Sequence, residues 1–177
     1  GFADDFQWRC APVGTCRIAG EFLVGEVGVV FNRAGRRDDI DALAAIARRA
    51  YAPFVERIGR APQPMLLDYR AEIAESEVWV AVDAGAIVGF VVLKSADDPS
   101  HLLLDNVAVD SPRHGTGVGR ELLQLAENRA RELGLTEVRL YTNEAMTENL
   151  ELYRRIGYRE IGRAVSNGYR RVHFSKR

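Results

Sequence analysis

Hydrophobic residues along this chain follow two spacings, which divide it into expected strands and expected helices. Runs rich in β-branched and aromatic residues predict strands at 29–31, 78–82, 86–93, 101–109, 137–141, 158–165 and 169–175. Apolar residues three or four positions apart predict helices from about 40 to 47, over 65–74, from the end of a glycine loop to 133, and over 147–156. This order predicts the α/β fold class: one mixed, twisted sheet of about six or seven strands, flanked by about four helices.

Polar residues and glycines mark where these helices should begin and end. Asp38 or Asp39, and later Thr147, carry the side-chain oxygens that cap helix N-termini. Gly134 and Gly157 follow two of the helices, as glycines do at C-termini. The expected buried face of the long helix consists of Leu122, Leu123, Ala126, Ala130 and Leu133.

The first 28 residues differ from the rest because they show no clear periodicity. We expect residues 1–28 to be an N-terminal extension of unknown role, in part vector-derived, and residues 29–177 to form one domain. Cys10 and Cys16 lie in this extension. A disulfide, half of a metal site or a nucleophile remain open for them, but free thiols are favoured because no Cys or His partners stand at zinc-binding spacing.

The overall composition is that of an ordinary globular domain. Hydrophobic residues make up 47% and charged residues 28%, and 24 basic against 25 acidic residues give a net charge of −1. A nucleic-acid or membrane partner is therefore not expected, since binders of polyanions usually carry a basic excess. No apolar run reaches the length of a transmembrane helix, and we expect a cytoplasmic protein.

The glycine-rich segment from Arg113 to Arg120 lies between an apolar strand, which we expect to be buried, and an amphipathic helix. Its three glycines let the backbone approach a ligand closely, and the free N–H groups and dipole of the following helix favour an anion. The pattern predicts a site for a phosphate or pyrophosphate. A P-loop is excluded because no lysine follows Gly119, and the third glycine comes one residue too early for a dinucleotide-binding fold. A flexible connection without a ligand stays open for the loop taken alone.

Two motifs resemble the GNAT family of N-acetyltransferases. His114-Gly115-Thr116-Gly117-Val118-Gly119 is similar to the family's Gln/Arg-x-x-Gly-x-Gly/Ala loop, apart from histidine at the first position. The segment 149–158, with Asn149, Leu152-Tyr153 and Gly157-Tyr158, is similar to the family's last helix, and 31–40 resembles its first strand and helix start. The resemblance covers about residues 29–176.

The resemblance implies that acetyl-CoA binds as a co-substrate and that no metal takes part. The strand from Leu104 to Val109 would pair its backbone with the pantetheine arm, and the N–H groups of the loop would hold the pyrophosphate. The residues implied in coenzyme binding are Val107, Ala108, Val109, His114, Gly115, Thr116, Gly117, Val118, Gly119, Arg120 and Asn149.

Acetyl transfer to an amine needs a deprotonated amine, donors for the developing oxyanion and a proton for the leaving thiolate. The resemblance places Tyr153 near the coenzyme sulfur as the proton donor, on the helix face of Asn149; a core aromatic residue is the alternative. It also implies that the N–H of Val107 serves as the oxyanion donor.

The base is the least determined role. Asp105 is an acidic residue in an apolar strand, expected on one face with Leu103 and Val107, and is a candidate general base. A structural carboxylate is an equal alternative, and deprotonation through water needs no dedicated base. Glu144 and His101 are poorer candidates, and His173 is expected to be structural. For Tyr51, Tyr69 and Trp79, core packing is favoured over a role in an acceptor pocket.

We therefore expect an N-acetyltransferase that moves the acetyl group of acetyl-CoA to a primary amine of a small molecule by direct attack in a ternary complex. Acetylation of a peptide or protein amine, and a non-catalytic acyl-CoA-binding module, remain alternatives. The partners expected are acetyl-CoA and an amine acceptor, and the resemblance leaves a homodimer open.

Overall fold

The computed structural model describes residues 31–95 and 100–177. The expected N-terminal extension with Cys10 and Cys16, the first two residues of the expected strand at 29–31, and residues 97–99 lie outside the described residues.

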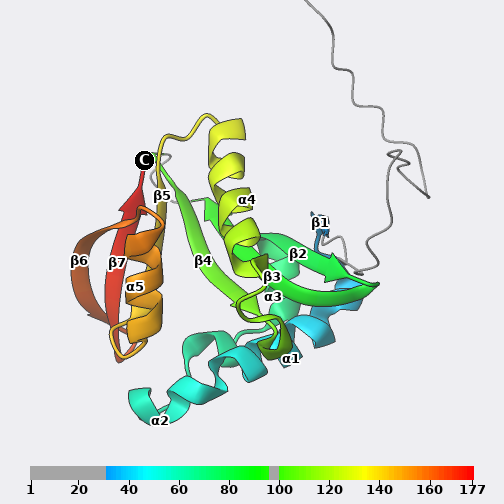
Figure 1. Cartoon of the computed structure of the whole chain (residues 1–177), viewed down its shortest axis with the longest axis horizontal. Coiled ribbons are helices and arrows are strands. Elements are labelled where there is room, and N and C mark those ends of the chain that lie inside the picture. Colours follow the sequence, from blue (N-terminus) through cyan, green and yellow to red (C-terminus); the bar gives the residue numbers. More distant parts are fainter. Residues whose placement is uncertain (1–30, 96–99) are drawn as a thin grey trace, which may run out of the picture.

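Seven strands form one sheet in the order β1-β2-β3-β4-β5-β7-β6 (Figure 1). Neighbouring strands are antiparallel except β4 and β5, which are parallel and are joined by a crossover through a helix. This confirms the predicted mixed sheet, and β4 is its central strand. The strands are β1 (Phe31–Ala34), β2 (Glu77–Asp83), β3 (Ala86–Ser95), β4 (Leu102–Val109), β5 (Val138–Asn143), β6 (Arg159–Ser166) and β7 (Tyr169–Lys176).

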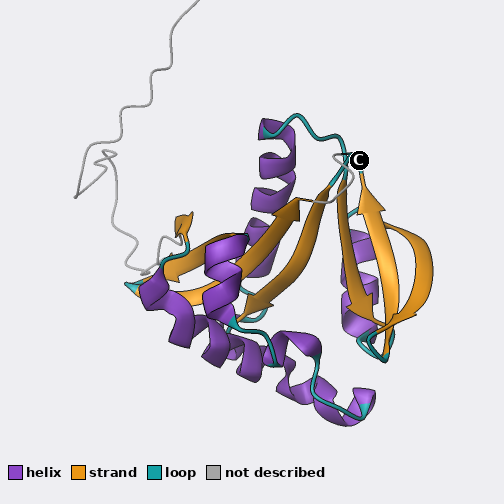
Figure 2. Ribbon diagram, turned by 180° about the vertical axis from the view of Figure 1, so that it is seen from behind, coloured by secondary structure: helices purple, strands orange, loops and turns teal. Residues whose placement is uncertain are grey.

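Helices cover both faces of the sheet. In the described residues these are α1 (Ile40–Tyr51), the one-turn α2 (Val55–Ile58), α3 (Tyr69–Glu75), α4 (Val118–Glu132) and α5 (Thr147–Arg155). α4 and α5 pack on one face, as Figure 1 shows, and α1 and α3 on the other, as seen from behind in Figure 2. Each face therefore has its own apolar core, with Leu122 and Phe174 central to the first and Ile46 and Phe90 to the second.

Both predicted hairpins are present, joining β2 to β3 and β6 to β7. Their turns contain Ala84, Gly85, Asn167 and Gly168, all with positive φ. Such turns match the twist of the flanking strands.

Several predicted helix ends were wrong in detail. The carboxylate of Asp39 does not cap α1, because it accepts two hydrogen bonds from Arg33, at 2.7 and 2.9 Å. The second helix begins only at Tyr69, since Asp68 caps it by accepting from the Arg70 N–H at 2.9 Å. Thr147 is the first residue of α5 and makes no capping contact. Leu133, expected to be buried, is 48% exposed because α4 ends one residue earlier.

A bulge in β4 overturns another prediction. Val92 pairs with Asn106 and Leu93 with Leu104, so Asp105 is an extra residue without a partner on β3. A bulge reverses the alternation of side chains beyond it. Leu104 accordingly packs in the core below α4 and α5, whereas Ala108 packs in the core below α1. Val107 packs on the α4 side, away from Asp105, so the expectation that these two residues share a face was wrong.

The parallel pairing of β4 with β5 is short. It joins only Leu102, Leu103 and Leu104 to residues 138–140, and beyond this point the two strands diverge (Figure 1). From Asp105 onward, the edge of β4 that faces β5 has no strand partner among residues 31–95 and 100–177. The fold thus leaves backbone groups open in the middle of its sheet.

Candidate active site

The glycine loop, residues 114–120, connects β4 to α4. Gly115 and Gly117 have φ of +78° and +97°, a left-handed conformation that other residues rarely adopt. A Cβ atom added at either glycine would meet nothing within 4 Å, so both face open space. The glycines are therefore needed for the path of the chain and leave room for a ligand beside it.

The backbone of this loop presents a group of free donors. In the described part of the chain, no protein acceptor is found for the N–H groups of Gly115, Gly117, Val118, Gly119 and Arg120. The last three belong to the first turn of the 15-residue α4, where the helix dipole adds positive potential. Five N–H groups near one helix N-terminus suit an anion such as a pyrophosphate.

The side chains of the loop have structural contacts that the sequence did not show. The His114 ring lies with Nε2 2.9 Å from the carbonyl oxygen of Val109, which fixes the loop to the end of β4. Thr116 Oγ1 donates to the Arg113 carbonyl at 2.7 Å. Arg113 forms an ion pair with the buried Asp83, whereas the exposed Arg120 has no ion-pair partner among the described residues.

The open edge of β4 presents donors of its own. The Asp110 N–H donates to Val88 on β3 at 2.8 Å. Because donors alternate along an antiparallel strand, the N–H groups of Asn106 and Ala108 face β3, and those of Val107 and Val109 face the gap toward β5. Of the three β4 residues predicted to bind the coenzyme, Val107 and Val109 thus present free N–H groups and Ala108 does not.

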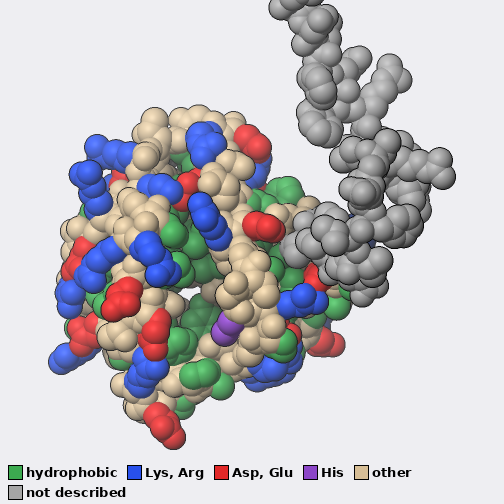
Figure 3. Space-filling model, viewed as in Figure 1, with side chains coloured by type: hydrophobic (Ala, Val, Ile, Leu, Met, Phe, Trp, Pro, Cys, Tyr) green, Lys and Arg blue, Asp and Glu red, His purple; other side chains and the backbone are tan. Residues whose placement is uncertain are grey.

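A cavity opens where β4 and β5 diverge, and we call it the central cavity. Its lining includes Tyr51, Gln63, Asp105, Tyr141, Tyr153 and Arg171. It has about 660 Å³ of empty space, counting its open mouth. Figure 3 shows the surface hollowed between α5 and β4, with apolar side chains around the opening. Six helices and strands that are far apart in sequence contribute to its walls: α1, α2, β4, β5, α5 and β7.

Asn149 and Tyr153 both face this cavity, as their spacing on one helix predicts. Tyr153 is 6% exposed and packs edge-on against Tyr158. Its hydroxyl has no hydrogen-bond partner among the described residues, and burial raises the pKa of Tyr153 to about 12. The phenol therefore carries its proton at neutral pH and is free to donate it to a ligand.

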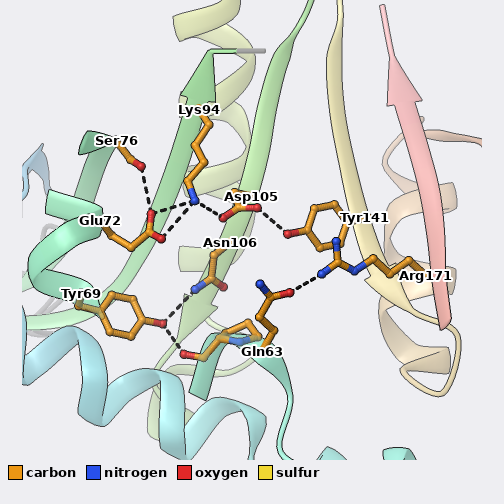
Figure 4. A network of polar contacts seen from close by, with 10 residues as sticks. Gln63, Tyr69, Glu72, Ser76, Lys94, Asp105, Asn106, Tyr141 and Arg171 are labelled. Carbon is orange, nitrogen blue, oxygen red and sulfur yellow. Dashed lines mark hydrogen bonds and ion pairs between the residues drawn. The ribbon is translucent and has the colours of Figure 1, made fainter. Parts of the chain in front are cut away.

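Asp105 is held in a polar network (Figure 4). One carboxylate oxygen accepts from the Tyr141 hydroxyl at 2.5 Å, and the other lies 2.8 Å from Lys94 Nζ. Lys94 also lies 3.1 Å from Glu72 on α3, so one ammonium joins two carboxylates. The Asp105 side chain is 13% exposed. The position of Asp105 in the bulge brings its carboxylate to the cavity wall, where its two oxygens contact Tyr141 and Lys94.

Of the three aromatic residues considered for an acceptor pocket, one lines the cavity. The Tyr51 hydroxyl lies 2.8 Å from Asn106 Oδ1 and 3.0 Å from the Val107 carbonyl, and burial raises the pKa of this phenol well above its ordinary value. Tyr69 is 2% exposed and packs edge-on against Phe90, and Trp79 packs beside α4 and donates to Glu77 at 2.6 Å.

The weaker candidates for a base lie outside the cavity lining. His101 precedes β4 and contacts Ser100 at 3.1 Å, and Glu144 is paired with Arg170 at 2.9 Å. Burial, and next the nearby Arg171, lower the pKa of His173.

Sequence reasoning missed Lys94, Tyr141, Gln63 and Arg171 as cavity or network residues. Tyr141 and Arg171 are polar residues within strands, which was the one available signal. It was not sufficient, because the bulge and the divergence of the strands decide which positions face the cavity.

The fold and the loop together define a class of protein. In the described residues, a seven-stranded mixed sheet diverges at its centre, next to a row of free N–H groups. The structure of the PaiA N-acetyltransferase from Thermoplasma acidophilum in complex with coenzyme A has this fold, with a TM-score of 0.70, 17% identity, and 84% of this chain and 99% of that chain covered. Ard1 from Thermoplasma volcanium matches with a TM-score of 0.66, 23% identity and 83% and 96% coverage. The fold is that of the acyl-CoA N-acyltransferases.

The family follows from the sequence comparison. The model of the acetyltransferase (GNAT) family matches residues 40–158, and this chain belongs to that family. Mycothiol acetyltransferase of Clavibacter sepedonicus is 34% identical over 138 residues, 76% of this chain and 44% of that protein. N-acetyltransferase 8B of Homo sapiens is 25% identical over 137 residues, 75% of this chain and 60% of that protein. The matches thus span less than two thirds of these relatives.

No helix within residues 31–95 and 100–177 is long and apolar enough to cross a membrane.

Proposed function

We propose that this protein is an acetyl-CoA-dependent N-acetyltransferase that acetylates a primary amine of a small molecule by direct attack in a ternary complex. The observation that carries the proposal is the group of five N–H donors between Gly115 and Arg120 that have no acceptor among the described residues, just after the strand whose edge toward β5 is open.

The loop fits the pyrophosphate of a coenzyme A. Five N–H donors and a helix N-terminus supply positive potential, and the left-handed glycines leave space for the phosphates. The N–H group of Val109 is available to the pantetheine arm on the open edge of β4, and the N–H group of Val107 to its thioester end. Bound acetyl-CoA supplies an activated acetyl thioester.

Two groups of the chain serve the transfer itself. The Val107 N–H, on the open edge, donates to the carbonyl oxygen of the thioester as negative charge develops there. Tyr153 donates its phenolic proton to the departing thiolate, which is the role its buried, unpaired hydroxyl suits. Asn149, which faces the same cavity, contacts the coenzyme beside it.

The amine must lose a proton before it attacks. Asp105 is our candidate for receiving it, directly or through a water molecule. Both of its oxygens already contact Lys94 and Tyr141, so the carboxylate is held in a fixed orientation at the cavity wall. The network thereby orients the amine as well as accepting its proton.

The size of the central cavity favours a small acceptor. The enclosed space is about 70 Å³, because the 660 Å³ includes open solvent at the mouth, and it admits a small group rather than a bulky one. A residue at the end of a peptide or a protein side chain would have to enter past α2 and the segment 61–67. Acetylation of a peptide or protein amine is the second candidate.

Two measurements test the proposal. Acetyl-CoA should raise the melting temperature, because at a hundredfold excess over its Kd it stabilises the folded protein by about 2.7 kcal/mol. Acetyl-pantetheine, which lacks the pyrophosphate, should raise the melting temperature less. Release of free thiol from acetyl-CoA should then depend on an added amine.

Three outcomes are decisive. The absence of any shift at millimolar acetyl-CoA contradicts the proposal. A shift without amine-dependent thiol release favours a non-catalytic acyl-CoA-binding module. Thiol release with peptides alone favours the second candidate.

A further inference from the structure

Arg171 on β7 is the one basic residue among the described residues that line the central cavity. Its guanidinium carbon lies 4.1 Å from the centre of the Tyr141 ring, and Nη2 donates to Oε1 of Gln63 (Figure 4). Gln63 belongs to the segment between α2 and α3 that covers the cavity. The guanidinium is therefore held in place between the sheet and this segment.

Arg171 forms no ion pair with any of the described residues. Among residues 31–95 and 100–177, no carboxylate lies within 4 Å of its guanidinium. The neighbouring Arg170, which points to the other side of the strand, is instead paired with Glu144 at 2.9 Å. An arginine that is partly removed from water and contacts only neutral groups gains most from an anion in the adjacent space.

The opposite charge lies in the same cavity. Asp105 is the one acidic residue among the described residues that line it, and it shares Lys94 with Glu72. Two carboxylates with one ammonium give a net negative network that reaches the cavity through Asp105. A net negative network and an unpaired cation at one cavity fit a molecule that carries both an amine and an anionic group.

We propose that the acceptor is an amine that also carries a carboxylate, and that Arg171 binds this carboxylate. The inference rests on the proposed function and specifies its substrate class. A carboxylate is favoured over a phosphate because the described lining offers a single cation. The planar guanidinium matches the two oxygens of a carboxylate.

The test compares pairs of amines that differ only in this group: amino acids and their carboxamides. Wild-type protein, Arg171→Gln and Arg171→Lys are assayed for kcat/KM by thiol release. Arg170→Gln is the matched control, because it removes the same charge from the same strand on the side away from the cavity. Taking each ratio of acid to amide relative to wild type cancels the different basicity of the two amines.

We expect wild type to prefer an acid over its amide. In Arg171→Gln, kcat/KM should fall about 10- to 100-fold for the acid, the range for a hydrogen bond to a charged group, and less than threefold for the amide. Arg171→Lys should keep part of the preference because it keeps the charge, and Arg170→Gln should keep all of it.

Other results overturn the inference. These are an equal fall for acid and amide in Arg171→Gln, or acetylation by wild type of the amides alone. The melting-temperature shift with acetyl-CoA shows whether Arg171→Gln folds. If it does not fold, the preference of the wild-type protein for an acid over its amide still tests the inference. Thiol release with amines that shows no preference for a carboxylate contradicts this inference alone. No release with any amine contradicts the proposed function as well.

Discussion

The glycine loop follows β4 and the central cavity is lined in part by β4, but the two regions consist of different chemical groups. The loop offers five backbone N–H groups from seven consecutive residues, and its side chains serve mainly to hold its shape. The cavity offers side chains from helices and strands that lie up to 120 positions apart, such as Tyr51 and Arg171.

Under the proposed function, this difference gives the glycine loop and the central cavity different roles in ligand specificity. Backbone donors bind a group that is the same for every member of a coenzyme-dependent class. Side chains around a cavity can change without altering the backbone, so they are the part that distinguishes one acceptor from another. Under the proposed function, the loop would therefore recognise the coenzyme and the central cavity would select the acceptor.

Tyr153 lines the central cavity and is the proposed proton donor to the thiolate, so its replacement should have the largest effect. Tyr153→Phe should lower kcat about 100-fold, because general-acid catalysis typically contributes that much, while the KM for acetyl-CoA stays within about threefold. Steady-state kinetics by thiol release at saturating acetyl-CoA measure both. An unchanged kcat would show that Tyr153 serves packing rather than proton transfer.

The loop should depend on its backbone conformation rather than on side chains. Gly117→Ala places a Cβ atom at a φ of +97°, and we expect the Kd of acetyl-CoA to rise about tenfold because left-handed backbone costs roughly 1–2 kcal/mol in alanine. Isothermal titration gives the affinity.

Gly134→Ala is the control for this substitution. Gly134 has a φ of +73° at the far end of α4 and also faces open space. The Gly134→Ala substitution should lower the stability of the fold by a similar amount but leave the Kd of acetyl-CoA unchanged. Equal losses of affinity in the two variants would argue that the loop conformation has no special role.

The smallest expected effect is on the stability of the fold at β5 and β7, the strands that carry Tyr141 and Arg171. Glu137, just before β5, accepts from Arg139 at 2.7 Å and from Ser175 on β7 at 2.6 Å, and these contacts lower the pKa of Glu137 to about 2. A carboxyl with a lowered pKa stabilises the fold above its unfolded pKa, near 4.5, and loses this contribution as the pH falls toward 2.

Glu137→Gln should therefore be less stable than wild type by about 1 kcal/mol at pH 7, a value kept small because Arg139 is 37% exposed. The difference should shrink as the pH falls from 4.5 toward 2. Urea unfolding at pH 7 and pH 3 measures it. Gln124→Ala, an exposed position of α4 without an ionisable side chain, is the control and should show no such change. A difference that does not depend on pH would contradict the role of the carboxylate.

Much of the fold could be predicted because its signals are local. The turns at Gly85 and Gly168, the amphipathic α4 and the glycine that ends it each depend on a few neighbouring residues. One error arose where a residue outside the helix took over a side chain. Asp39 looked like a helix cap, but Arg33 occupies its carboxylate.

For the candidate site, the sequence predicted the glycine loop better than the central cavity. The loop and the helix face of Asn149 and Tyr153 were found by spacing, since both lie within single elements. The partners of Asp105 were not found, because one extra residue in β4 redirects the strand. Periodicity alone cannot show a bulge, since an inserted residue and a regular strand can have the same apolar pattern.

By itself, the sequence determined the order of elements, the family resemblance and the loop suited to an anion, because backbone conformation and local spacing depend on neighbouring residues. Only the tertiary structure decided that β4 and β5 diverge after Leu104, that Lys94 joins Asp105 to Glu72, and that Arg171 faces the cavity without a carboxylate partner among the described residues. Those contacts join residues from separate elements, and their energies depend on packing and burial that arise when the sheet and its two helical layers come together.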